Sequence, residues 1–356
     1  MIFDDTIAAI ATPIGEGGIG IIRISGPSAK EIGLKILVNR KKEFFSEIQV
    51  REVYHGLVVN PVNQHFLDEV IFFYLKGPKS FTGEDTLEIQ AHGGTFILSK
   101  ILEIALQNGA RMAEPGEFSQ RAFLNGRIDL VQAESIIDLI RAKTDKAHEL
   151  ALSQLTGRAS NTLAEIENDL YQILITIEAT LDFPEEGIPE PEKEQIHFQT
   201  TQALQRLKTL LEGVDEGRKI RDGVKLVIVG RPNVGKSSFL NELLQEERAI
   251  VTAIPGTTRD IIEAPYQLKG VPIRLIDTAG LRETENVIEQ IGIAKTEQSI
   301  EQADLIVFIL DGSQPINRED KQVMAKIKGR KALVIINKTD LPQILKKEDL
   351  LGFDPE

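Results

Sequence analysis

Cysteine is absent from this chain of 356 residues, which excludes disulfides, thiolate zinc sites and a cysteine nucleophile within it. The five histidines show neither HExxH nor paired spacing, which argues against a zinc centre. Basic residues are in deficit, since 41 lysines and arginines stand against 54 aspartates and glutamates and the net charge is −13. A nucleic-acid footprint is therefore not expected as the main surface, although a local basic patch or a basic partner remains open.

Long hydrophobic runs are missing as well. No run approaches the roughly 18 apolar residues of a membrane span, and the first residues, MIFDDTIAAIATPIG, carry acids where a signal peptide needs lysine or arginine. With 42% hydrophobic and 27% charged residues, the composition is typical of a globular protein. We expect a cytoplasmic protein without a membrane segment, and the length suits two or three domains.

Three regions of different character follow one another. The first, residues 1–120, alternates β-type runs such as 18–26 and 69–77 with glycine-rich turns, and has helical spacing at 94–109. These patterns predict an α+β domain.

The second region, residues 121–215, is predicted to be an α-helical middle domain. Gly157 marks a turn, the acidic, proline-rich stretch 182–194 indicates an exposed loop, and a further helix is expected at about 195–211. Apolar residues step by three and four, which indicates a packing face rather than a cofactor site. These residues are Ala133, Ile136, Ile137 and Ile140, and then Leu163, Ile166, Leu170, Ile173, Leu174, Ile177 and Leu181.

The third region, residues 216–356, alternates apolar strands with helical segments. Strands are expected at 224–229, 272–276, 305–310 and 332–336. This order predicts an α/β domain with a mostly parallel, doubly wound sheet.

Residues 230–237, GRPNVGKS, fit the phosphate-binding pattern GxxxxGK[ST] between a strand and a helix. Its glycines let backbone N–H groups close around phosphate oxygens, Lys236 reaches the β- and γ-phosphates, and the Ser237 hydroxyl is a ligand for Mg²⁺. The alternative is an ordinary glycine turn. The nucleotide contacts expected here are Asn233, Val234, Gly235, Lys236, Ser237 and Ser238.

Two later stretches are typical of switch segments. DTAG follows an apolar strand, which places Asp277 near Mg²⁺ and the Gly280 N–H near the γ-phosphate. VTAIPGTTRD offers threonine hydroxyls to Mg²⁺, although ordinary loop threonines would look the same. Leu281 stands where many GTPases carry a glutamine that orients the attacking water, so either hydrolysis is poor or the catalytic group lies elsewhere. The expected nucleotide contacts are Thr252, Ala253, Ile254, Pro255, Gly256, Thr257, Thr258, Asp277, Thr278, Ala279 and Gly280.

Residues 337–340, NKTD, follow the last apolar strand. Asp340 can accept hydrogen bonds from N1–H and the 2-amino group of guanine, which adenine lacks. Lys338 can lay its stem along the base, and Asn337 completes the expected contacts. A lone NKxD also fits a turn cap, but its position after the other two motifs predicts GTP and GDP as ligands. The three motifs in this order predict that residues 216–356 form an α/β P-loop (Ras-like) G domain.

Outside these motifs the chain contains DTIAAIATPIGEGGIGIIRISG, SFTGEDTLEIQAHGG, EPGEFSQRAFLNGRIDLVQAESIIDLI and LDFPEE, in this order. With them the whole chain resembles the bacterial tRNA-modification GTPase family MnmE (TrmE). The resemblance implies an N-terminal domain that forms a homodimer and binds a folate of the 5-formyltetrahydrofolate type. Its folate contacts would be Arg23, Glu88 and Arg127, whose charges suit the folate glutamate and the pterin amino groups. Without the resemblance, each reads as a surface salt-bridge partner.

The resemblance also implies a reaction and its partners. The family modifies C5 of the wobble uridine of certain tRNAs, giving an aminomethyl or carboxymethylaminomethyl group, together with the FAD-dependent protein MnmG (GidA). The acidic balance is consistent with tRNA being held largely by that partner.

Hydrolysis without a glutamine is explained by the same resemblance, which implies activation by K⁺ and by dimerisation of the G domains. K⁺ would stand where an arginine finger stabilises developing charge. Glu289 would be the catalytic base or water-orienting residue, although a glutamate there also suits a helix N-terminus. The implied ligands are Asn233, Thr252, Ile254 and Thr257 for K⁺, and Ser237 and Thr258 for Mg²⁺.

The chain ends at Glu356, whereas the family continues with a further strand, a guanine-contacting loop and helices. We therefore expect an incomplete G domain with an exposed sheet edge and an incomplete middle domain. The leading prediction is a K⁺-stimulated GTPase of tRNA modification. The alternatives are a GTP-switched ribosome-assembly or binding factor, and a folate-binding fragment whose G domain is not competent.

Overall fold

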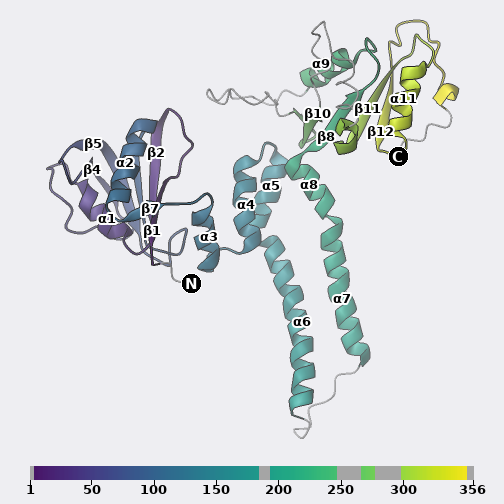
Figure 1. Cartoon of the computed structure of the whole chain (residues 1–356). Coiled ribbons are helices and arrows are strands. Elements are labelled where there is room, and N and C mark those ends of the chain that lie inside the picture. Colours follow the sequence, from purple (N-terminus) through teal and green to yellow (C-terminus); the bar gives the residue numbers. More distant parts are fainter. Residues whose placement is uncertain (1–3, 184–192, 247–265, 277–297, 351–356) are drawn as a thin grey trace. The chain divides into compact units, whose positions relative to one another are not determined.

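The computed structural model describes residues 4–183, 193–246, 266–276 and 298–350 (Figure 1). Contacts between Cα atoms divide the chain into two compact units, Met1–Glu134 and Ser135–Glu356. The three-domain division at residues 120 and 215 stays a prediction. Among the described residues, no helix combines the length and the apolar character needed to cross a membrane.

A seven-stranded sheet forms the centre of the first unit's described part, in the order β3-β4-β5-β6-β2-β1-β7. Its neighbours are antiparallel except for β7, which runs parallel to β1. In β5, the buried Val70, Phe72 and Tyr74 alternate with more exposed residues, which is the period of a sheet with one covered face. The elements are β1 (Thr6–Ile10), β2 (Gly17–Ser25), α1 (Ala29–Ile36), β3 (Leu37–Val38), β4 (Val53–Val59), β5 (Phe66–Leu75), β6 (Thr86–Gly93), α2 (Thr95–Gln107), β7 (Ala110–Met112) and α3 (Glu117–Leu124), with α4 (Leu130–Arg141) crossing the unit boundary.

Helices α1 and α2 pack on this sheet, and their apolar residues share one core with it. Ile32 and Ile101 from the helices are as fully buried as Ile22, Leu87 and Ile89 from the strands. The predicted runs 18–26, 69–77 and 94–109 correspond to β2, β5 and α2, so the α+β prediction is confirmed for this region.

Helices dominate the beginning of the second unit. Gly157, with φ +87°, precedes α6 and confirms the predicted turn. The predicted packing face of α6 is only partly covered by described residues, since Ile166 is buried whereas Leu163, Leu170 and Leu181 are exposed. Residues 184–192 of the predicted loop lie outside the described residues. The helices are α5 (Asp145–Leu155), α6 (Arg158–Asp182), α7 (Lys193–Glu212) and α8 (Val214–Asp222), and α6 packs against α7.

A second sheet of five described strands follows, in the order β12-β11-β8-β10-β9, parallel except for β9. Successive residues of β11 enter two different core clusters, Phe308 one and Ile309 the other. Such burial on both faces explains its continuous apolar run. The prediction of a mostly parallel sheet is confirmed for the described strands. The elements are β8 (Val224–Val229), α9 (Lys236–Glu246), β9 (Tyr266–Leu268), β10 (Val271–Ile276), β11 (Leu305–Asp311), α11 (Arg318–Ile327), β12 (Ala332–Asn337) and a 3₁₀ turn, η2 (Lys347–Leu350).

The start of α11 has a capping box formed by Asn317 and Asp320. Asn317 accepts a hydrogen bond from the Asp320 N–H (2.9 Å) with its side chain, and Asp320 accepts one from the Asn317 N–H (3.1 Å). This reciprocal capping satisfies two backbone donors at the first turn.

Candidate functional site

The loop between β8 and α9 has the backbone of a phosphate-binding cradle. Asn233 and Gly235 have positive φ values of +62° and +100°, and the buried Val234 anchors the loop. A Cβ atom at Gly235 would collide with the side-chain nitrogen of Asn337. Glycine is therefore required there by both backbone conformation and space.

Lys236, the first residue of α9, points back into this loop. Its Nζ donates to the carbonyl oxygens of Gly230 (2.8 Å) and Arg231 (2.6 Å). Burial lowers the pKa of Lys236, so its charge favours an anionic partner. Phosphate oxygens are stronger acceptors than these two carbonyls and suit the same ammonium. Ser237 and Ser238 are exposed in the first turn of α9, where a helix N-terminus favours anions.

The NKTD segment meets the phosphate loop directly. Asn337 Nδ2 donates to the Val234 carbonyl (2.8 Å), and this bond joins two motifs that lie 103 residues apart. Asp340 lies beyond Lys338 in the following turn and is exposed. The structure therefore brings 233–238 and 337–340 together at the carboxyl end of the parallel strands, where open α/β sheets bind ligands.

Asp311, which the sequence interpretation missed, holds the lysine of this segment. Lys338 has φ +60°, and its Nζ donates to Asp311 Oδ2 (2.8 Å). Burial works to raise the pKa of Asp311, but hydrogen bonds from Lys338 and Ser313 outweigh it and bring the pKa to about 2. The signal was present, because Asp311 ends the buried run LIVFILD and is paired with Asn337 across β11 and β12.

The switch predictions lie outside the described residues. They concern the Mg²⁺ and K⁺ ligands of residues 251–260, the DTAG segment with Leu281, and the catalytic Glu289. The residues are Thr252, Ala253, Ile254, Pro255, Gly256, Thr257, Thr258, Asp277, Thr278, Ala279, Gly280, Leu281 and Glu289.

The three residues expected to contact folate all lie in the first unit. Arg23 on β2 and Glu88 on β6 are direct partners across the sheet, and Arg23 Nε donates to Glu88 Oε1 (2.7 Å). The Arg23 guanidinium also lies over two rings, 5.3 Å from the centroid of Phe81 and 5.6 Å from that of Phe118. An arginine between aromatic rings and beside a carboxylate suits an aromatic ligand that carries charge.

The Arg127 side chain contacts the backbone of the loop that carries Phe81. Its Nε donates to the Ser80 carbonyl (3.0 Å), next to Phe81. Gly83, with φ +79°, is so close that an added Cβ would stand 3.1 Å from Arg127 Cγ. The loop 80–85 thus connects Arg127 with the pair of Arg23 and Glu88.

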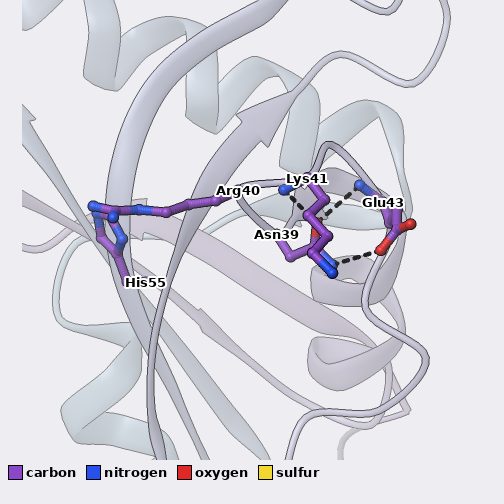
Figure 2. Close-up of a pocket in the computed structure, with 5 residues that line it drawn as sticks. All are labelled: Asn39, Arg40, Lys41, Glu43 and His55. Carbon is purple, nitrogen blue, oxygen red and sulfur yellow. Dashed lines mark hydrogen bonds between the residues drawn. The ribbon is translucent and has the colours of Figure 1, made fainter.

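A cavity of about 480 Å³ in the first unit contains none of the predicted site residues. Figure 2 shows Arg40 and His55 on one side of it and the Asn39 carboxamide bonded within its own loop on the other. Glu69 accepts from Arg40 (3.3 Å) and contacts His55 (3.0 Å), so it offsets the basic groups that would attract an anion. We assign it no function. Its lining is Asn39, Arg40, Lys41, Glu43 and His55.

Comparison with known proteins gives two matching family models. The one described as "GTP-binding protein TrmE N-terminus" matches residues 6–127, and the one described as "50S ribosome-binding GTPase" matches residues 225–338. The first covers Arg23, Glu88 and Arg127, and the second runs from β8 to Lys338.

Relatives match nearly the whole chain. A "tRNA modification GTPase MnmE" from Geobacter metallireducens is 51% identical over 97% of this chain and 75% of its own length. Proteins of the same description from Desulforamulus reducens and Clostridioides difficile are 50% and 46% identical, over 95% and 99% of this chain and 73% and 76% of theirs. A solved GTP-binding protein from Sulfolobus solfataricus in complex with GDP is 18% identical over 68% of this chain and 67% of that one, with a TM-score of 0.24, which is too low to support an argument.

Proposed function

The chain belongs to the MnmE family of tRNA modification GTPases, and from this premise we propose that it hydrolyses GTP in the modification of tRNA at C5 of the wobble uridine. The observation that supports GTP hydrolysis is the contact between the phosphate loop, residues 230–237, and the NKTD segment, residues 337–340. Asn337 is bonded to Val234 while Lys236 lies inside the loop. One nucleotide would therefore meet the phosphate loop and the guanine-reading segment together.

The nucleotide and its metal ions would be held by residues on both sides of this contact. Mg²⁺ bound by Ser237 and Thr258, and K⁺ bound near Asn233, would offset charge on the transferred phosphoryl group. Lys236 would exchange its two carbonyl partners for phosphate oxygens, and Asp340 would accept from guanine. Glu289 would orient the attacking water in place of the glutamine that Leu281 replaces.

The first unit would bind the one-carbon donor. A 5-formyltetrahydrofolate-type ligand would lie by Arg23, Glu88 and Arg127, with its pterin or benzoyl ring near Phe81 and Phe118. We further propose a homodimer through this unit, a folate-binding-like fold for it and a helical middle domain at 121–215. The FAD-dependent MnmG would be the partner that holds most of the tRNA.

The GTPase proposal is tested by turnover in K⁺ and in Na⁺. The expected result is faster GTP hydrolysis in K⁺ and a loss of activity in Glu289→Ala, with Glu242→Ala, on the exposed face of α9, as the matched control. Equal rates in the two salts, together with an active Glu289→Ala variant, would contradict this mechanism.

The second candidate is a GTP-switched factor of ribosome assembly, which the description of the model matching residues 225–338 favours. That match leaves the first unit unexplained, whereas the model described as "GTP-binding protein TrmE N-terminus" matches residues 6–127 and the MnmE relative covers 97% of the chain. Co-sedimentation of the chain with ribosomal subunits in a GTP-dependent manner would favour this candidate over the first.

A further inference from the structure

Three side chains that follow β7 in the chain donate hydrogen bonds to the loop 80–85, and we call this set of contacts the clasp. Arg121 NH1 donates to both carboxylate oxygens of Glu84 (3.2 Å each), and Asn125 Nδ2 donates to the Thr82 carbonyl (2.8 Å). Arg127 completes the series at the Ser80 carbonyl. The contacts run in antiparallel order, so they fix the loop at three points to α3 and to the residues that follow it.

This clasp joins the two aromatic rings that flank Arg23. Phe81 belongs to the loop and Phe118 belongs to α3, yet the Arg23 guanidinium lies over both. The distance between the rings therefore depends on how the loop is held to the helix. Neither ring is fixed for Arg23 by the strands β2 and β6 alone.

Arg121 is the buried part of the clasp. Its side chain is fully buried, and besides Glu84 it donates to Asp5 Oδ1 (2.7 Å) and Glu117 Oε1 (3.0 Å). Glu84 also accepts from Ser25 Oγ on β2 (2.8 Å). A buried guanidinium is retained only where carboxylates and other acceptors satisfy it, and here those acceptors come from the chain start, the loop and α3.

We propose that the Arg121–Glu84 contact positions the ligand site around Arg23, Glu88 and Arg127, by holding the loop that carries Phe81 against the helix that carries Phe118. The inference rests on the proposed folate site and adds to it two residues that would not touch the ligand. Binding geometry that depends on such supporting contacts is sensitive to shifts of an ångström or less.

The test compares two variants, each of which neutralises one carboxylate that is paired with the Arg121 guanidinium. Glu84→Gln weakens the loop side of the network, whereas Asp5→Asn weakens the chain-start side and leaves the loop contact intact. The full chain is titrated calorimetrically with 5-formyltetrahydrofolate. We expect the Kd to rise about tenfold in Glu84→Gln and less than about twofold in Asp5→Asn.

Two further readouts separate positioning from general destabilisation. Amide hydrogen exchange should become faster in peptides covering 78–86 of Glu84→Gln, and the Kd for GDP should be unchanged in both variants. Equal weakening of folate binding in the two variants, or none in either, would overturn the positioning role while leaving the folate site in place. Absence of folate binding by the unaltered chain would overturn the proposed site and this inference with it.

Discussion

Arg23 and Arg121 in the first unit and Lys236 in the second unit have different kinds of hydrogen-bond partner. In the first unit, Arg23 is paired with Glu88 and Arg121 with three carboxylates, so arginines and acids satisfy each other. In the second unit, Lys236 donates to backbone carbonyls of its own loop. These carbonyl oxygens are weaker acceptors for the Lys236 ammonium than phosphate oxygens would be.

This difference indicates which site depends on its ligand. The network around Arg121 joins the chain start, loop 80–85 and α3 whether or not a ligand is bound, so it should contribute to folding. The Lys236 ammonium should instead contribute to nucleotide affinity, because under the proposed function it would exchange the Gly230 and Arg231 carbonyls for phosphate oxygens. Substitutions in the two networks should therefore change different measured quantities.

The largest effect is expected from Arg121→Met, which removes the fully buried guanidinium that joins Asp5, Glu84 and the buried Glu117. Breaking a buried ion network in this way costs about 3–5 kcal/mol. Hydrogen exchange in β2 and β6 of the full chain should report the loss, with β8 and β11 unchanged. The matched control, Arg206→Met, removes an exposed pair with Asp169 and should cost under about 1 kcal/mol. Similar losses in both variants would break the comparison.

The second largest effect is expected from Lys236→Ala, which should lower nucleotide affinity and leave the stability of the first unit unchanged. We expect GDP affinity to fall about a hundredfold, because a charge-assisted contact to phosphate is lost, while the exchange rates of β2 and β6 stay the same. Fluorescence titration with a labelled GDP measures the affinity, and Lys225→Ala on β8 is the control. Retained affinity in Lys236→Ala would show that the loop does not hold phosphate.

Acid should weaken the first unit through Glu117. Hydrogen bonds from Arg111 lower the Glu117 pKa from 4.5 to about 2, although burial opposes the shift. Because the folded-state pKa is depressed, the stabilisation is complete above a pH of about 4.5 and is lost as the pH falls toward about 2. The free energy of unfolding of the first unit can be measured by amide hydrogen exchange in β2 between about pH 6 and pH 3. It should depend less on pH in Glu117→Gln than in the unaltered chain. An unchanged slope would contradict the role assigned to Glu117.

A smaller effect is expected from Asp311→Asn, which weakens the support of Lys338. Loss of one charge-assisted hydrogen bond that does not touch the ligand should raise the Kd for GDP about fivefold. Ser313→Ala, which removes a hydroxyl bonded to the same carboxylate, should change it less. Tighter binding in Asp311→Asn would mean that the Lys338–Asp311 pair competes with the nucleotide.

The sequence predicts those features that depend on local spacing. The buried run of β11, the turn at Gly157 and the phosphate loop ending at Lys236 are all visible as residue patterns, because strand period, glycine conformation and helix starts act over a few residues. Spacing does not predict the pairing of Arg23 with Glu88, since 65 residues separate them. Only the family resemblance places these two residues at one site.

The features that the sequence does not predict depend on the fold as a whole. The stretch RAFLNGR gives no sign that Arg121 is fully buried, because its acceptor Asp5 lies 116 residues away. Composition favours a surface position for any arginine, and the packing of α3 against both loop 80–85 and the chain start at Asp5 reverses this. Likewise, the spacing on α6 predicts a covered face but not how much of it the described helices cover.

The most direct test of the account is a calorimetric titration of the full chain with Mg·GDP and Mg·ADP. If the phosphate loop and the NKTD segment form one guanine-nucleotide site, GDP should bind at least about a hundredfold more tightly than ADP, because adenine would leave Asp340 without its donors. Equal affinities for the two nucleotides, or no binding of either, would contradict the account.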